Sequence, residues 1–438
     1  MSNIPTKYLA LVLSFLAIGL EAKAATTYTQ YNFNSSLSGP QSWSTTTNWT
    51  PNASPGTTVT SGTNTGYAYI TAASGALNVT TPSSATLVGG VFLTASSGNA
   101  VTLTLGNDLT LDTIASAQPG APYTAGSYTN TGASSDLNID LKGYTYNAIR
   151  LSNGNNYGAA PTIGPTVSMT IKSSGSAGGT FVTDNYGAGG TGAMDIQDNA
   201  TVYVRAPASA GLNTVNTTFS ATSTFQFQGG GSTAGSGGQN LVVKQSPAGN
   251  QAFGNLIIGD NSASKLFTNA ALTQNQQLVG GVPHIMVVRG NMTLVNNADG
   301  IGRVNLSLGS SYSNINVLQI GGNYRDEGGS VQSYTTTGQY SAIITMNGGT
   351  TERTMSVNRT INTTGTTHTD FTIGDATSAG NTKMSNYSSS AGALYTSGSM
   401  TVYNGSRLNL DHSTTTGSVA SLKAGSIIIG ETSTAGSV

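Results

Sequence analysis

Short runs of alternating apolar and polar residues recur along the chain, and each ends in Gly, usually followed by Asn, Asp or Glu. Alternation places every second side chain on the same side of a strand. Gly or Asn after the run supplies the left-handed backbone conformation that most residues avoid. The pattern therefore predicts short strands joined by tight corners. The runs begin at Leu103 (LTLGND), Asn255 (NLIIGD), Met286 (MVVRGN), Val317 (VLQIGGN), Asp370 (DFTIGD) and Ser426 (SIIIGE).

The spacing of these runs favours a stack of coils. Gly290-Asn291 and Gly322-Asn323 are 32 residues apart, although the period drifts elsewhere. Strands this short cannot bury a core alone, but stacked coils cover one another. Asn at equivalent corners is then expected to bond to its counterpart one coil away. With about 20–25 residues in each coil, a rod of roughly 80–90 Å is expected.

Other all-β folds fit less well. Outside the N-terminus we find no long apolar stretch with helical periodicity. A propeller predicts a steadier period of about 40–50 residues, and a string of sandwiches predicts clearer linkers. The Gly-, Ser- and Pro-rich segments Ser116–Ser127 and Gln228–Gln239 are read as loops that protrude from the coils.

The N-terminus indicates export. An apolar run from Tyr8 to Leu20 is followed by Ala22-Lys23-Ala24, which has the form of a signal-peptide cleavage site. The expected domains are a signal peptide (1–24), a cap region (25–66) and a parallel β-helix (67–438). No later segment is apolar enough to span a membrane, so a secreted, extracellular or cell-surface location is expected.

The N-terminal Trp box runs from Trp43 to Gly56 (WSTTTNWTPNASPG) and carries both Trp residues of the chain. A rod of coils needs a plug over its first open edge, because a bare edge templates aggregation. We therefore expect Trp43 and Trp49 to belong to a cap; stacking on a sugar is the alternative.

The amino-acid composition argues against nucleic-acid binding and against cysteine chemistry. Only 8% of the residues are charged, the net charge is −1 and Lys and Arg are scattered, so no nucleic-acid partner is expected. The chain has no Cys, which excludes disulfides and thiol chemistry.

The Trp box followed by coils of the form Gly-Asn-x-Thr-Leu resembles exported β-solenoid proteins of Gram-negative bacteria with autotransporter-associated β-strand repeats. Ala342–Val357 (AIITMNGGTTERTMSV) is similar to another of their coils. The resemblance implies a right-handed parallel β-helix, a secreted or surface location and no defined catalytic residues. Members usually continue into a sorting helix or a membrane barrel, whereas this sequence stops at GETSTAGSV, so a C-terminal truncation is expected.

Paired carboxylates are the main candidates for chemistry. Asp108 and Asp112 are four apart, as are Asp136 and Asp140, and even spacing puts both members on one face of a strand. A polysaccharide lyase also needs a base nearby. Lys142 and Arg150 make the segment 136–150 the best enzymatic candidate. Solvated polar positions are the simpler interpretation.

The remaining motifs are weaker. Gly321-Gly322 lacks the Lys-Ser/Thr and the following helix of a phosphate loop. Gly187–Gln197 nearly fits a calcium nonapeptide, but Met194 stands where Asp is required and Asp195 is one residue late. Asp195 and Asp198 flank a turn-like step. The His residues, His284, His368 and His412, are isolated. We therefore expect no catalytic residues, cofactor or metal.

The leading hypothesis is a non-enzymatic β-solenoid that acts as a surface scaffold or adhesin. It would display a face rich in Thr, Asn and Tyr to extracellular glycans or surface proteins. The alternative is a carbohydrate-active β-helix enzyme, either a polysaccharide lyase or a hydrolase. A passive matrix component without a specific ligand is a third option.

Overall fold

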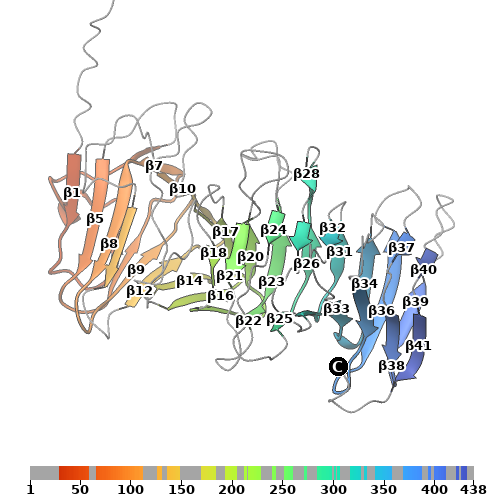
Figure 1. Cartoon of the computed structure of the whole chain (residues 1–438). Helices are drawn as coiled ribbons and strands as arrows, with labels where there is room; N and C mark the ends of the chain where they lie inside the picture. Colours follow the sequence, from red (N-terminus) through yellow and green to blue (C-terminus); the bar gives the residue numbers. More distant parts are fainter. Residues whose placement is uncertain are drawn as a thin grey trace, which may run out of the picture.

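The computed structural model describes residues 29–58, 66–111, 126–130, 136–147, 169–183, 193–204, 212–214, 216–227, 239–242, 251–259, 271–273, 284–297, 300–301, 303–305, 316–326, 330–332, 341–357, 368–386, 393–395, 399–410, 421–423 and 426–431. The described part is almost entirely β-structure, with one short 3-10 turn, η1 (Thr46–Asn48). The expected signal peptide lies outside it. Strands follow one another as stacked coils, so the prediction of an all-β parallel β-helix is confirmed (Figure 1).

A full coil contributes one strand to each of three faces, in a fixed order along the chain. Face 1 comprises β3 (Trp49–Thr50), β1 (Thr29–Phe33), β5 (Gly66–Ala72), β8 (Gly90–Ala95) and β11 (Gly126–Asn130), then β18 (Leu212–Asn213), β21 (Gln239–Val242), β24 (Ala271–Thr273), β29 (Arg303–Asn305) and β32 (Ser330–Gln332), and finally β37 (Ala393–Tyr395) and β40 (Ser421–Lys423).

Face 2 consists of two seven-stranded sheets. The first contains β2 (Gly39–Ser42), β6 (Leu77–Thr80), β9 (Ala100–Thr104), β12 (Asp136–Asp140), β14 (Met169–Ser173), β16 (Met194–Asp198) and β19 (Thr217–Phe219). The second contains β22 (Gln251–Phe253), β25 (His284–Val288), β30 (Asn316–Ile320), β33 (Ser341–Met346), β35 (His368–Ile373), β38 (Ser399–Tyr403) and β41 (Ser426–Glu431).

Face 3 is one 13-stranded sheet that runs the length of the molecule. Its strands are β4 (Thr57–Thr58), β7 (Thr86–Val88), β10 (Leu109–Leu111), β13 (Thr145–Asn147), β15 (Thr180–Thr183), β17 (Thr201–Val204), β20 (Thr224–Phe227), β23 (Asn255–Ile258), β26 (Met292–Leu294), β31 (Tyr324–Asp326), β34 (Gly349–Val357), β36 (Gly380–Asn386) and β39 (Arg407–Leu410). A small hairpin, β27 (Asn296–Asn297) and β28 (Gly300–Ile301), leaves the stack after β26.

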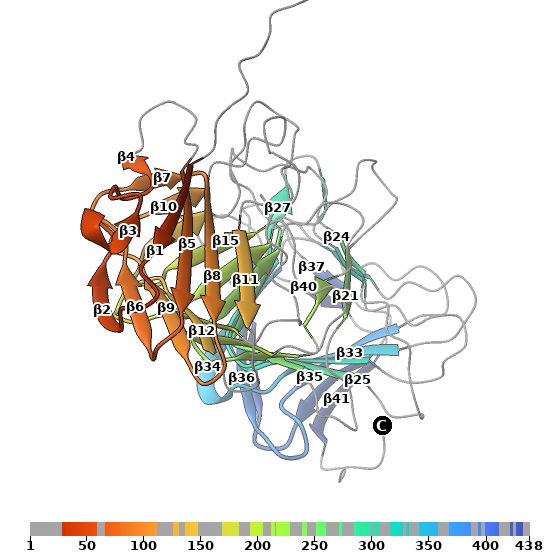
Figure 2. The ribbon, with the colours of Figure 1, turned by 90° about the vertical axis from the view of Figure 1, so that its left-hand side faces the viewer.

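The coils are longer and fewer than the sequence pattern predicted. On face 3, Phe181 pairs with Val202, 21 residues on, but Leu109 pairs with Tyr146, 37 residues on. The expected 20–25 residues hold only for the shortest coils, because many coils carry extra residues between strands that keep their register. From β7 to β39 the strands of face 3 stack about 4.8 Å apart, so the stack is roughly 50 Å long. Seen from the N-terminal end, the turns have the right-handed sense usual for parallel crossovers (Figure 2).

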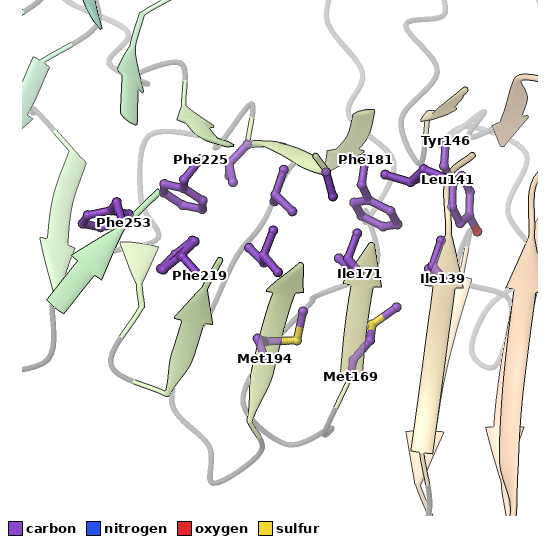
Figure 3. Packing of buried hydrophobic residues seen from close by; sticks show 14 of the residues in the cluster. Ile139, Leu141, Tyr146, Met169, Ile171, Phe181, Met194, Phe219, Phe225 and Phe253 are labelled. Carbon is purple, nitrogen blue, oxygen red and sulfur yellow. The ribbon is translucent and has the colours of Figure 1, made fainter. Parts of the chain in front are cut away.

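Inward-pointing apolar side chains form one continuous column along the axis. Ile139, Ile171 and Ile196 occupy equivalent positions on β12, β14 and β16, and each is fully buried. Phe219, Phe225 and Phe253 continue the column, with ring centroids 4.7–5.9 Å apart (Figure 3). Each coil thus covers the apolar side chains of its neighbours, which is how strands of two to nine residues bury a core.

The Gly-Asn corners differ from the prediction in one respect. Gly290 and Gly322 are not in the left-handed region; they are needed because successive coils approach too closely for a side chain. A Cβ on Gly322 would lie 2.7 Å from Asn291 Oδ1 and closer still to the Gly290 carbonyl. The left-handed conformation does occur at other predicted corners, such as Gly259 and Gly374.

The N-terminal end of the stack is closed by short antiparallel strands. β3 pairs antiparallel with β1, and β4 pairs antiparallel with β7. Trp43 and Trp49 are 0% and 1% exposed, with ring centroids 5.0 Å apart. Trp49 Nε1 donates to the Trp43 carbonyl at 2.7 Å, and Trp43 Nε1 donates to the Pro55 carbonyl at 2.8 Å. Such burial leaves neither indole available for stacking on a sugar.

Candidate functional site

One row of polar side chains crosses face 3; as far as β31 it lies where the chain enters this face from face 2, and in β34, β36 and β39 it lies within the strands. We call it the corner row. Each member lies beside its counterpart in the next coil, and every side chain is half-buried or exposed. The row consists of Asp108, Thr145, Thr180, Thr201, Thr224, Asn255, Asn291, Asn323, Thr354, Lys383 and Asn409.

An Asn ladder holds the central part of the corner row in place. Asn255 Oδ1 accepts a hydrogen bond from the Asn291 N–H at 2.8 Å, and Asn291 Oδ1 accepts from the Asn323 N–H at 2.9 Å. Asn323 Oδ1 then accepts from the Thr354 N–H at 2.8 Å. The predicted contact between Asn residues of successive coils is therefore confirmed, but the partner is the backbone N–H of the next residue in the row. The side chains are fixed rather than free to rotate.

The sequence did not reveal the full row. The 32-residue step from Gly290-Asn291 to Gly322-Asn323 was visible. The sequence pattern predicts a corner at Gly259, which directly follows β23 on face 3. The corner equivalent to Gly290-Asn291 is instead Gly254-Asn255. The four threonines of the row that precede Asn255 are Thr145, Thr180, Thr201 and Thr224. Each stands directly before an inward-pointing residue, on β13, β15, β17 and β20 respectively. Their equivalence depends on coil lengths that the sequence does not show.

The best enzymatic candidate segment, residues 136–150, does not form a reactive pair within its described part. Asp136 is exposed at the start of β12, whereas Asp140 is 6% exposed at its end. Asp140 accepts from the Ser174 N–H at 2.9 Å and from Ser174 Oγ at 2.6 Å, and Lys142 Nζ lies 3.7 Å away. Ser174 belongs to the following coil. Asp140 thus ties two coils together, and Arg150 lies outside the described residues.

Other carboxylates make the same kind of contact between coils. Asp108 accepts from the Thr145 N–H at 2.7 Å, and Asp195 accepts from Thr218 Oγ1 at 2.7 Å. Asp370 accepts from the Ser399 N–H at 2.6 Å. Asp198 has φ +52° and forms the turn after β16. Asp112, the partner proposed for Asp108, is not among the described residues.

Asp375 is held by four donors in the turn after β35. Its Oδ1 accepts from the N–H groups of Thr377 and Ser378 at 2.8 Å and from Thr377 Oγ1 at 2.7 Å, and its Oδ2 accepts from Asn347 Nδ2 at 3.1 Å. Burial acts to raise the pKa of Asp375, but these hydrogen bonds outweigh it and the pKa is lowered. The carboxylate therefore stabilises this turn in its charged form.

The metal and histidine candidates are dispersed. In the calcium-like segment, Met194 points into the core at 3% exposure and Asp195 points outward; Gly189 is outside the described ranges. His284 begins β25 and His368 begins β35, while His412 lies outside the described part. Within the ranges that the structure describes, no three His, Asp or Glu side chains are grouped so that they would hold a metal ion.

Tyrosine contributes less to the displayed surface than expected. Tyr67, Tyr146, Tyr203 and Tyr324 are all buried. Tyr69 is half-buried and stacks on Phe92 with ring centroids 4.2 Å apart. Tyr31, Tyr144 and Tyr403 are half-buried as well, so the described tyrosines offer only partly exposed rings to a partner.

The corner row is chemically suited to binding rather than to covalent chemistry. Nine of its members are neutral hydroxyl or amide side chains, and the two charged members, Asp108 and Lys383, lie near opposite ends. Such groups both donate and accept hydrogen bonds without exchanging protons near neutral pH. In the described residues there is no helix of the length and hydrophobicity that a bilayer crossing requires. Comparison of the chain with protein-family models, with curated proteins and with solved structures gave no match.

Proposed function

We propose that this chain is a secreted or cell-surface β-solenoid that acts as a scaffold or adhesin and binds uncharged extracellular glycans along its corner row. The observation that carries the proposal is the unbroken series of neutral polar side chains from Thr145 to Thr354, one from each coil. The Trp box and the signal-like N-terminus favour the same secreted class.

The mechanism follows from the geometry of the stack. Successive members of the corner row are about 4.8 Å apart, because that is the spacing of neighbouring strands. A polysaccharide lying parallel to the rod would meet a hydroxyl or an amide at every coil. Each bond contributes about 1 kcal/mol net, so one contact binds weakly, but several on one rigid row add with little further loss of entropy. Because the Asn ladder already fixes its side chains, less rotamer entropy is lost on binding.

Binding of the purified chain to an array of neutral and acidic glycans tests the proposal. The key variant carries Thr145→Val, Thr180→Val and Thr201→Val, which removes three consecutive hydroxyls while keeping side-chain shape. Loss of three contacts of about 1 kcal/mol each predicts a fall in affinity of roughly 100-fold. The matched control carries Thr80→Val, Thr102→Val and Thr170→Val, on the outward side of face 2, and should bind as the parent chain does. Equal losses in both variants, or no glycan binding at all, would contradict the proposal.

The carbohydrate-active enzyme remains the second candidate. A lyase needs several carboxylates and a base gathered in one groove, whereas the carboxylates of Asp108, Asp140, Asp195 and Asp370 each bond to a neighbouring coil. Incubation with uronate polymers, with and without calcium, tests it through the absorbance of the unsaturated product. A signal that disappears in Asp140→Asn but persists in the matched substitution Asp136→Asn would favour the enzyme.

A further inference from the structure

Face 3 changes in charge along the rod. Its strands from β4 to β26 carry no charged residue. The strands β31, β34, β36 and β39 carry Arg325, Asp326, Glu352, Arg353, Lys383 and Arg407. The charged residues on the described strands of this face are therefore confined to these four neighbouring strands.

Arg353 occupies a corner position that is glycine in the coil before it. The Thr354 N–H bonds to Asn323 Oδ1, so Arg353 takes the place of Gly322. A Cβ on Gly348 would lie 2.9 Å from Arg353 Cγ and 3.1 Å from its Nε. The stem of the arginine side chain is therefore packed directly against the backbone of Gly348, which holds the guanidinium in place.

The guanidinium of Arg353 has no partner among the residues that the structure describes. Its Nε is buried without a hydrogen-bond acceptor, and the side chain makes no ion pair there. Thr382 lies opposite Arg353 on β36, and Thr382 Oγ1 and the neighbouring Asn381 Oδ1 are likewise buried without a partner. Most buried polar groups in proteins are paired. Because Arg353 as a whole is half-buried, the end of its guanidinium reaches solvent and its charge is available to an anion.

Two further cations lie on the outward side of the strands that follow. Lys383 is opposite Asn409 of β39, and Arg407 is two residues before Asn409 on the same side. One carboxylate lies among them, because Glu352 Oε2 accepts from Asn409 Nδ2 at 2.7 Å. Arg353, Lys383 and Arg407 outnumber this carboxylate, so the surface attracts anions.

We propose that Arg353, Lys383 and Arg407 form a binding surface for the carboxylate or sulfate groups of an acidic polysaccharide. A planar guanidinium binds two oxygens of such a group through parallel N–H···O bonds. Arg353 is already held against Gly348, so little rotamer entropy is lost when it binds. The surface continues the corner row, so a polymer lying along the rod reaches both. That the anion belongs to a glycan rests on the proposed function, whereas the recognition of charge does not.

Titration of the purified full chain with an oligogalacturonate tests the proposal, and the carboxyl-reduced form of the same oligosaccharide is the neutral probe. The acidic probe should bind more tightly than the neutral one, and added salt should remove the difference. Arg353→Gln should weaken binding of the acidic probe by roughly tenfold or more, because it removes hydrogen bonds to a charged group. Lys172→Gln, on the outward side of face 2, is the matched control and should bind as the parent chain does.

A second variant and a second probe sharpen the test. Lys383→Gln with Arg407→Gln leaves the buried corner unchanged and should also weaken binding of the acidic probe. Circular dichroism should show that Arg353→Gln stays folded, because no hydrogen bond or ion pair with a described residue is lost. Dextran sulfate separates recognition of sulfate from recognition of carboxylate.

The outcomes separate this surface from the neutral part of the corner row. The variant with Thr145→Val, Thr180→Val and Thr201→Val should keep the difference in affinity between acidic and neutral probes, even if neutral glycans do not bind the row. Failure to bind either acidic probe overturns the proposal. Equal affinity for the acidic and the neutral oligosaccharide overturns it as well, and so do equal losses in Arg353→Gln and Lys172→Gln.

Discussion

Replacing Gly322 with Ala tests whether the corner glycines are required by the close approach of coils. The new Cβ would lie 2.7 Å from Asn291 Oδ1 and closer to the Gly290 carbonyl group, which is backbone and cannot turn aside. Ordinary contact between such atoms needs about 3.4 Å, so the two coils must separate by roughly 1 Å at this corner.

The size of the effect follows from the bonds that cross this gap. The Gly322 N–H donates to the Gly290 carbonyl at 2.8 Å, and the Asn323 N–H donates to Asn291 Oδ1 at 2.9 Å. A separation of about 1 Å breaks both, and each contributes about 1 kcal/mol net. Together with the packing strain of an inserted methyl group, the expected loss is about 2–4 kcal/mol.

Urea unfolding followed by circular dichroism measures this loss, and amide hydrogen exchange locates it at residues 322–326. Gly349→Ala is the matched control, because Gly349 has φ +75° and nothing within 4 Å of its Cβ position. That change carries only backbone strain, of about 1–2 kcal/mol. If Gly322→Ala unfolds at the parent urea concentration, or costs less than Gly349→Ala, the close-approach argument is wrong.

Three further predictions follow from described contacts. The pKa of Asp375 is lowered in the folded state, so its contribution to stability is present above the ordinary Asp pKa of about 3.9 and is lost as the pH falls through the folded value. Asp375→Asn should therefore flatten the acid side of a plot of unfolding midpoint against pH, and an unchanged slope would refute this. Trp49→Phe should destabilise the N-terminal end by about 1–3 kcal/mol, because the Trp43 carbonyl loses its buried donor; fluorescence of the remaining Trp43 reports it, and an unshifted transition contradicts it. Asn291→Asp or Asn323→Asp alone should be tolerated, since the acceptor oxygen stays. The double variant places two charges about 5 Å apart and should lose roughly 1 kcal/mol of stability beyond the sum of the single changes. Added salt should recover this stability, and simple additivity would argue against the ladder.

Local pattern was sufficient to predict the class of fold. Alternation in segments such as Leu103–Leu105 identified inward positions, and the Gly-Asn repeats identified corners that the structure places one coil apart. These features depend on neighbouring residues and on the conformational preferences of a few residue types. Inward positions and corners can therefore be predicted from the sequence without knowing which strands are neighbours.

The register between coils was not predictable in the same way. Thr145, Thr180 and Thr201 lie side by side although 35 and then 21 residues separate them. Their alignment is decided by which apolar residues meet in the core, as when Tyr146 pairs with Phe181. The roles of Asp140 and Ser174 could not be predicted for the same reason, because the hydrogen bond that joins them crosses between coils.

The direction of the hydrogen bonds has a mechanical consequence. Strands lie across the long axis, so the bonds between coils point along it and carry any pull on the two ends in series. A chain held at one end and drawn at the other should yield coil by coil. Each opened coil of 21 to 37 residues would release on the order of 70–130 Å of slack. If the chain acts as the adhesin proposed above, successive small extensions of this kind would limit the peak force on the attachment.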